Sequence, residues 1–276
     1  MVMIADVPFF PQEEYQCGPA ALATMLSFTG IAVNSEDLVD DVYLPRRNGS
    51  LQVEMTAAAR SHGRLSYRID PYLDQLISEV EAGNPVLVLQ NLGLRISPQW
   101  HFAVVKGVDL TEENLILNSG SIENYSLSLK VFERTWARAE YWAVVITSPG
   151  SIPATASAQN YFLSMVDLEH SYDNTDELKL AYASGVSRWP GNRDLLMAYG
   201  NLLLTSDEPL EAAAAYRQVI DHYPQYSPAL NNLAHTLHKL GQSREALVYA
   251  EQAIRWGDGF NETYQKTYHG ITESVQ

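Results

Sequence analysis

The sequence predicts an α+β domain, built of N-terminal helices and an antiparallel sheet, followed by an all-α solenoid. Three observations support this prediction. Helical patterns come before four apolar, β-branched runs in the first half, an order typical of α+β domains rather than doubly wound ones. The second half is helical in pattern almost throughout and contains a repeat of fixed period. A stretch of small residues with two prolines, 147–158, separates the halves.

The elements of the first half follow from apolar spacing and turn residues. Helices are expected over 19–28, 50–61 and 73–81, the first with Pro19 in its opening turn. Strands are expected over 85–90, 102–108, 114–118 and 141–147. The link from Val108 to Asn114 is short and polar, so the second and third strands should form a hairpin.

The second half repeats itself with a period of 34 residues. Residues of the same kind stand one period apart in the pairs Tyr182 and Tyr216, Pro190 and Pro224, Ala212 and Ala246, and Glu211 and Glu245. This period is that of the tetratricopeptide repeat, and a plain helical bundle would seldom keep one register at so many positions. Repeats are predicted over 159–192, 193–226 and 227–260, the first being the weakest copy. The expected domains are therefore 1–148, a linker over 149–158, and a repeat domain over 159–276.

Composition excludes several classes of protein. The chain has 276 residues, of which 46% are hydrophobic and 18% charged, so it can bury a core and is not disordered. Its formal net charge is −15, which disfavours nucleic acid as a partner because the phosphate backbone would be repelled. No apolar stretch approaches the roughly 20 residues that cross a bilayer, so no transmembrane segment is expected. The first ten residues show no signal peptide.

The single cysteine, Cys17, is the candidate nucleophile. One cysteine excludes an intramolecular disulfide and a zinc site of several cysteines, and its ordinary interpretation is a small buried apolar residue. However, Cys17 directly precedes the Gly-Pro that begins a helix, where backbone N–H groups favour a thiolate. Its own N–H can also face an oxyanion. Gln12, five residues upstream, can supply a second oxyanion donor through its amide.

A thiol nucleophile needs an imidazole base, and the first half contains two histidines. His62 stands before Gly63 at an expected helix end, so we interpret it as a cap. His101 opens a strand after a polar turn and can face a cleft, which makes it the predicted base. Trp100 beside it either lines a substrate subsite or packs internally.

The base in turn needs an acceptor that holds its useful tautomer. Asn118 ends the strand that returns from the hairpin, 17 residues after His101, and is the predicted orienting residue. Asp109 is the competing candidate, but it stands in the turn and should shape it.

Together, Gln12, Cys17-Gly18-Pro19-Ala20, WHFAVV around His101 and LILNSG around Asn118 resemble the bacteriocin-leader, or double-glycine, cysteine peptidases of papain-like fold. The resemblance covers roughly residues 5 to 148. It implies a Cys-His-Asp/Asn catalytic set, a glutamine in the oxyanion hole and cleavage after small residues, often Gly-Gly. The chain departs from leader-processing members in the spacing of Gln12, in Gln16 before the cysteine, and in having asparagine for aspartate. It is more similar to stand-alone bacterial members joined to tetratricopeptide repeats.

The expected function is hydrolysis of peptide bonds through an acyl-enzyme, with a peptide or protein substrate and no metal or organic cofactor. The repeats should bind a partner protein or substrate segment in their groove, although they could simply pack on the peptidase. Two alternatives stay open: an amidase, acyltransferase or deamidase on the same Cys-His pair, and an idle peptide-binding adaptor. The resemblance implies the bacterial periplasm or envelope if a leader has been removed, and the cytoplasm otherwise.

Overall fold

A computed structural model describes residues 1–12, 16–47, 49–257 and 261–275. The chain forms two compact units, Met1–Asn174 and Thr175–Gln276. Over the described residues, no helix combines the length and the apolar character that a membrane-spanning segment requires.

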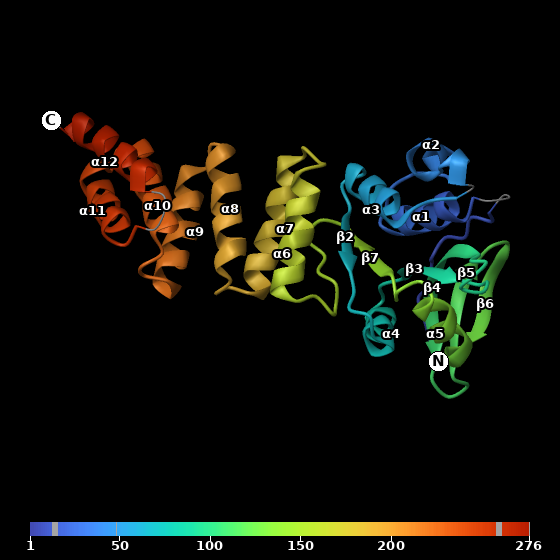
Figure 1. Cartoon of the computed structure of the whole chain (residues 1–276). Helices are drawn as coiled ribbons and strands as arrows, with labels where there is room; N and C mark the ends of the chain where they lie inside the picture. Colours follow the sequence, from blue (N-terminus) through green and yellow to red (C-terminus); the bar gives the residue numbers. More distant parts are fainter. Residues whose placement is uncertain (13–15, 48, 258–260, 276) are drawn as a thin grey trace. The chain divides into compact units, whose positions relative to one another are not determined.

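The first unit is built on one antiparallel sheet (Figure 1). Its strands run in the order β2-β7-β3-β4-β5-β6, and β1 pairs with the end of β4. Their bounds are β1 Val2–Met3, β2 Leu65–Arg68, β3 Val86–Asn91, β4 Trp100–Asp109, β5 Asn114–Ser119, β6 Ile122–Ser128 and β7 Ala143–Thr147. The central strands β3 and β7 are buried along their whole length, so this sheet carries the core.

Helices cover the sheet. They are α1 Cys17–Phe28, α2 Val39–Val42, α3 Gln52–Ser61, α4 Leu73–Glu81, α5 Leu129–Ala137 and α6 Ala158–Glu169, with 3-10 turns at Glu36–Leu38 and Pro45–Arg47. Helix α1 packs against β4 and β3, which places its N-terminus near the start of β4. The α+β class, the three helices, the four strands and the hairpin predicted from sequence are confirmed.

Several elements of the first unit escaped the sequence prediction: the short elements β1 and α2, and also β6, β2 and α5. Strand β6 is an edge strand whose residues are mostly exposed, so it has no buried apolar run to reveal it. Strand β2 has only four residues. Helix α5 buries Phe132 and Trp136, but it has only nine residues, and an amphipathic pattern this short between two strands is easily missed.

The β4–β5 hairpin contains a β-bulge at Lys106. Asp109 pairs with Asn114 and Gly107 with Ile116, but beyond them Val105 pairs with Leu117 and Val104 with Asn118. Lys106 is thus the extra residue on β4. Because side chains alternate between the two faces of a strand, a shift of one residue changes which residues of β5 share a face with those at the start of β4.

The segment predicted as a linker is fixed to the first unit. The buried carboxylate of Glu79 on α4 accepts hydrogen bonds from the Thr155 N–H at 2.7 Å, the Ala154 N–H at 3.1 Å and the Asn84 side-chain amide at 2.6 Å. Helix α6 then packs on β2 and α3. The boundary between the compact units therefore lies after residue 174 and not within 149–158, and the predicted repeat 159–192 is divided between the units.

The second unit is helical throughout its described residues. Its helices are α7 Thr175–Arg188, α8 Arg193–Thr205, α9 Pro209–His222, α10 Ser227–Lys239, α11 Ser243–Arg255 and α12 Asn261–Val275. The α8–α9 and α10–α11 pairs correspond to the repeats predicted over 193–226 and 227–260. Residues 258–260 of the last repeat, and residue 276, lie outside the described residues.

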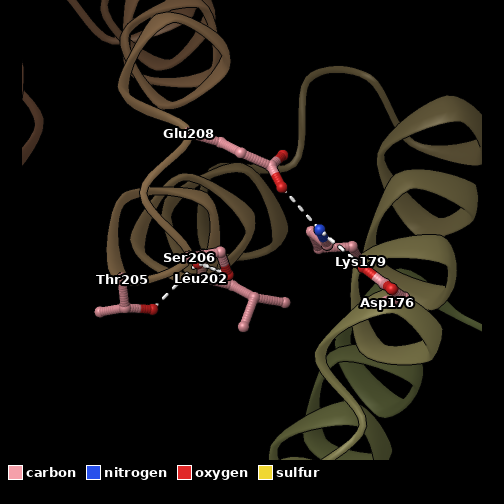
Figure 2. A network of polar contacts seen from close by, with 6 residues as sticks. All are labelled: Asp176, Lys179, Leu202, Thr205, Ser206 and Glu208. Carbon is pink, nitrogen blue, oxygen red and sulfur yellow. Dashed lines mark hydrogen bonds and ion pairs between the residues drawn. The ribbon is translucent and has the colours of Figure 1, made fainter.

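Small residues allow the paired helices to cross closely. A side chain at Gly200 on α8 would place its Cβ 2.6 Å from the ring of Tyr216 on α9, and Ala234 occupies the equivalent position of the next pair. Polar contacts secure the turns between helices: Lys179 on α7 lies 2.9 Å from an Asp176 oxygen and 2.6 Å from a Glu208 oxygen, beside the α8–α9 turn (Figure 2).

Replacing Glu79 should loosen the segment that it holds. In Glu79→Ala, the backbone N–H groups of Ala154 and Thr155 lose the buried carboxylate that accepts from them, so we expect the free energy of unfolding of the first unit to fall by about 2–4 kcal/mol. Urea unfolding followed by tryptophan fluorescence measures this loss, and limited proteolysis should cut within 149–158. Glu81→Ala, an exposed position on the same helix, is the control. Equal stability of the two variants would contradict the proposed anchoring.

Gly18 should tolerate no side chain. A Cβ there would lie 2.6 Å from the Ser50 Cβ and closer still to the Ser50 hydroxyl, so Gly18→Ala should lower the free energy of unfolding by about 1–3 kcal/mol. Adding Ser50→Gly should recover much of that loss in a double-mutant cycle. Gly270→Ala is the control, because a Cβ there would meet no atom of another described segment within 4 Å. Strictly additive effects of the two substitutions would mean that Ser50 is not the obstacle.

Candidate active site

A cavity of about 700 Å³ in the first unit brings together residues that are distant in the sequence. It is bordered by the start of α1, the segment before α3 and the start of β4. The lining residues that matter for chemistry are Gln12, Cys17, Arg47, Ser50, Trp100 and His101. Cys17, His101 and Gln12, predicted separately from local patterns, therefore face one space.

Cys17 is the first residue of α1, as the Gly-Pro signal predicts. Burial raises the pKa of its thiol above the ordinary value, while backbone hydrogen bonds from Phe102, Gly18 and Cys17 itself act in the opposite direction. The sequence predicted that the helix N-terminus would favour the thiolate. Its N–H groups do act in that sense, but burial outweighs them, so the resting group is the thiol.

His101 is the second residue of β4 and pairs with Gln90 of β3. Burial lowers the pKa of its imidazole below the ordinary value. The ring is therefore neutral at neutral pH and can accept a proton. The site at rest holds a thiol and a neutral imidazole.

The predicted contact between Asn118 and His101 is absent. Asn118 donates through Nδ2 to the Pro8 carbonyl at 3.0 Å, and its Oδ1 accepts from the Asn124 N–H at 3.4 Å. The cause is the bulge at Lys106. It pairs Asn118 with Val104, and since His101 stands three residues before Val104, the two side chains point to opposite faces.

The imidazole contacts the next residue of the strand instead. Nε2 of His101 lies 2.8 Å from Oγ of Ser119, within hydrogen-bond distance. Ser119 went unnoticed in the sequence because serine is common in turns, and only the register of the hairpin assigns it to the face of His101. No sequence signal we used could have found it.

Gln12 lines the cavity and is held by its backbone, which donates from N–H to the Gly120 carbonyl at 3.2 Å. Within the described parts of the chain, its side-chain amide has no hydrogen-bond partner. The amide is thus available to an atom in the cavity. The last two residues of β5 and the residue after them therefore serve the site: Asn118 holds the segment leading to Gln12, Ser119 contacts His101, and Gly120 anchors Gln12.

Among the remaining candidates, Trp100 faces the cavity, whereas His62 and Asp109 have the roles that their ordinary interpretations gave them. Trp100 lines the cavity with 54% of its surface exposed, so it is accessible from solvent. His62 caps the end of α3 and lies 3.9 Å from Asp41, away from the cavity. Asp109 accepts hydrogen bonds from the Thr111 and Glu112 N–H groups and so shapes the turn.

Comparisons with known proteins agree with this architecture. The model of the Peptidase_C39 like family matches residues 4–144, and a tetratricopeptide-repeat model matches residues 215–248. A search of curated proteins found no match.

Among solved structures, a C39-like peptidase described from Bacillus anthracis is 17% identical, with a TM-score of 0.44, and covers 53% of this chain and 96% of its own. The peptidase domain of Streptococcus ComA, a bi-functional ABC transporter, is 21% identical, with a TM-score of 0.41, and covers 51% of this chain and 98% of its own. A double-glycine-motif protease from an AMS/PCAT transporter, solved in complex with the leader peptide, is 21% identical, with a TM-score of 0.39, and covers 53% of this chain and 97% of its own. The family match spans about half of the chain, and with the cavity at Cys17 it leads to one conclusion: this chain belongs to the Peptidase_C39 like family and joins a peptidase-type domain to tetratricopeptide repeats.

Proposed function

We propose that the chain is a cysteine peptidase that hydrolyses peptide bonds through an acyl-enzyme formed on Cys17. The observation that supports this most is the shared cavity, in which a thiol at a helix N-terminus, an imidazole and a carboxamide without a hydrogen-bond partner among the described residues meet. These are the groups that nucleophilic attack, proton transfer and oxyanion binding require.

The reaction begins with the neutral pair. His101 takes the thiol proton as the Cys17 sulfur forms a bond to the scissile carbonyl carbon. The carbonyl oxygen becomes an oxyanion, which accepts hydrogen bonds from the Cys17 backbone N–H and the Gln12 amide. When the tetrahedral intermediate collapses, His101 gives its proton to the leaving amine and a thioester remains. Water then attacks the thioester, with His101 again as base, and the acid and the free thiol are released.

Family membership supports a proposal for the substrate class. We propose cleavage after small residues, of the Gly-Gly type, with Trp100 lining the subsite next to the scissile bond. The helical repeats would recruit the substrate or a partner protein, because such solenoids bind peptides on their concave surface. A purely structural role for the repeats is the alternative.

A peptidyl electrophile ending in glycine tests the Cys-His pair directly. We expect rapid labelling of wild type at Cys17, none in Cys17→Ala, and a loss of about 10²–10⁴-fold in the rate for His101→Ala, since general base catalysis contributes that much. Intact-mass spectrometry over time measures the rates, and His62→Ala is the matched histidine control. Labelling of Cys17 at the rate of an ordinary thiol, unchanged in His101→Ala, would favour the adaptor. With a peptide substrate in place of the probe, capture of the acyl group by an added amine faster than by water would favour an acyltransferase.

The pH dependence of labelling should reflect the effect of burial on the pKa values of His101 and Cys17. The pKa of His101 is lowered from 6.5, so the wild-type rate should hold at pH 6.5 and fall only at lower pH, as the base becomes protonated. The pKa of Cys17 is raised from 9.0, so in His101→Ala the rate should rise only above pH 9, where the thiol ionises unaided. Rate profiles from pH 4.5 to 10.5 measure both limbs. An acid limb centred above pH 6.5 would contradict a base that burial keeps neutral.

A further inference from the structure

We propose that Ser119 is the residue that orients the His101 imidazole, in the place that a carboxylate or carboxamide was expected to fill. The inference rests on the proposed function only in taking His101 as the base. It starts from the 2.8 Å contact between Ser119 Oγ and His101 Nε2. Among the residues that the structure describes, this is the hydrogen bond found for the imidazole side chain of His101.

The contact fixes which ring nitrogen faces the chemistry. With Nε2 occupied by Ser119, Nδ1 is the nitrogen left for the cavity that also holds Cys17. To take the thiol proton, Nδ1 must carry a lone pair, so the hydrogen must sit on Nε2. In that tautomer the Ser119 hydroxyl accepts a hydrogen bond from Nε2–H. A ring without this partner would be free to adopt the other tautomer, in which Nδ1 carries the hydrogen and cannot act as base.

The backbone makes the placement of Ser119 specific. The β4–β5 pairing assigns Asn118 to the face opposite His101, so the adjacent residue returns to the face of His101. A second irregularity, between Leu117 and Ser119 in the pairing with β6, lets the end of β5 leave the regular ladder at this point. The Asn118 amide secures that turn to Pro8, which leaves it no role on the ring.

The electrostatic surroundings agree with a neutral partner. Among the described residues that line the cavity, the charged or titratable neighbours of His101 are Cys17 and Arg47, and no carboxylate is present. A carboxylate beside the ring would favour its charged form, whereas a hydroxyl gives a hydrogen bond without that charge. Burial is accordingly the effect that governs the pKa of His101, and it lowers it.

The test reads the ring itself, in the full chain. Long-range ¹H–¹⁵N spectra report which nitrogen of each histidine is protonated, and loss of signals in His101→Gln identifies this ring among the seven histidines. At pH 8 we expect wild type and Ser119→Thr to show Nε2 protonated and Nδ1 unprotonated. Ser119→Ala should show a mixture of tautomers. Ser119→Asp should raise the titration midpoint of the ring by about 1 to 3 pH units. Ser126→Ala, on exposed β6, is the serine control and should match wild type.

Labelling of Cys17 provides the second readout. We expect a fall of about 3- to 10-fold in Ser119→Ala, which is the share of one hydrogen bond, and recovery in Ser119→Thr and Ser119→Asp. Ring signals that are unchanged in Ser119→Ala would overturn the inference, as would a tautomer change in Asn118→Ala but not in Ser119→Ala. If Cys17 is never labelled but the ring spectra change as expected, the peptidase proposal fails and the role of Ser119 stands. Should Ser119→Ala not fold, the midpoint in Ser119→Asp decides the matter.

Discussion

The site depends on the backbone of strand β4. This one strand carries His101, directs the Phe102 hydrogen bond toward the Cys17 sulfur, and pairs with β5 through the bulge at Lys106. The bulge decides which side of β5 meets the imidazole, and so it selects Ser119 over Asn118. A single extra residue in a strand reverses the facing of all the residues beyond it. The chemistry available to the imidazole is therefore set several residues away from it.

Burial is the second constraint. It raises the pKa of Cys17 and lowers the pKa of His101, so both groups are neutral in the resting protein. The N–H groups around the sulfur oppose this effect and are in place to stabilise the thiolate once the proton moves. A hydroxyl partner at Nε2 fits this balance, because it orients the ring without adding a charge beside two largely buried groups. Cys17 and His101 are thus positioned for proton transfer as a neutral thiol and a neutral imidazole, and not as a preformed ion pair.

Specific contacts between segments that are distant in the sequence hold the first unit together. Glu79 ties the segment after β7 to α4, Asn118 ties the N-terminal segment to β5, and Gly18 lets the start of α1 lie against Ser50. The two polar side chains accept hydrogen bonds from distant segments or donate hydrogen bonds to them, and the glycine avoids a steric clash with one. The second unit follows another principle, in which each helix packs on its neighbours in the chain and small residues such as Gly200 allow close crossings.

The sequence by itself determined the α+β class, the helices and strands with strong apolar periodicity, the hairpin, the repeat period, and the candidates Cys17, His101 and Gln12. These depend on local signals: a Gly-Pro after the cysteine, runs of β-branched residues, and a 34-residue register. Only the tertiary structure decided that the proline-containing segment 149–158 is docked, that burial outweighs the helix N-terminus at Cys17, and that Ser119 meets His101. The reason is physical. Burial and strand register are set by contacts between segments far apart in the chain, and a bulge of one residue leaves no mark in the pattern of a strand that is buried on both faces.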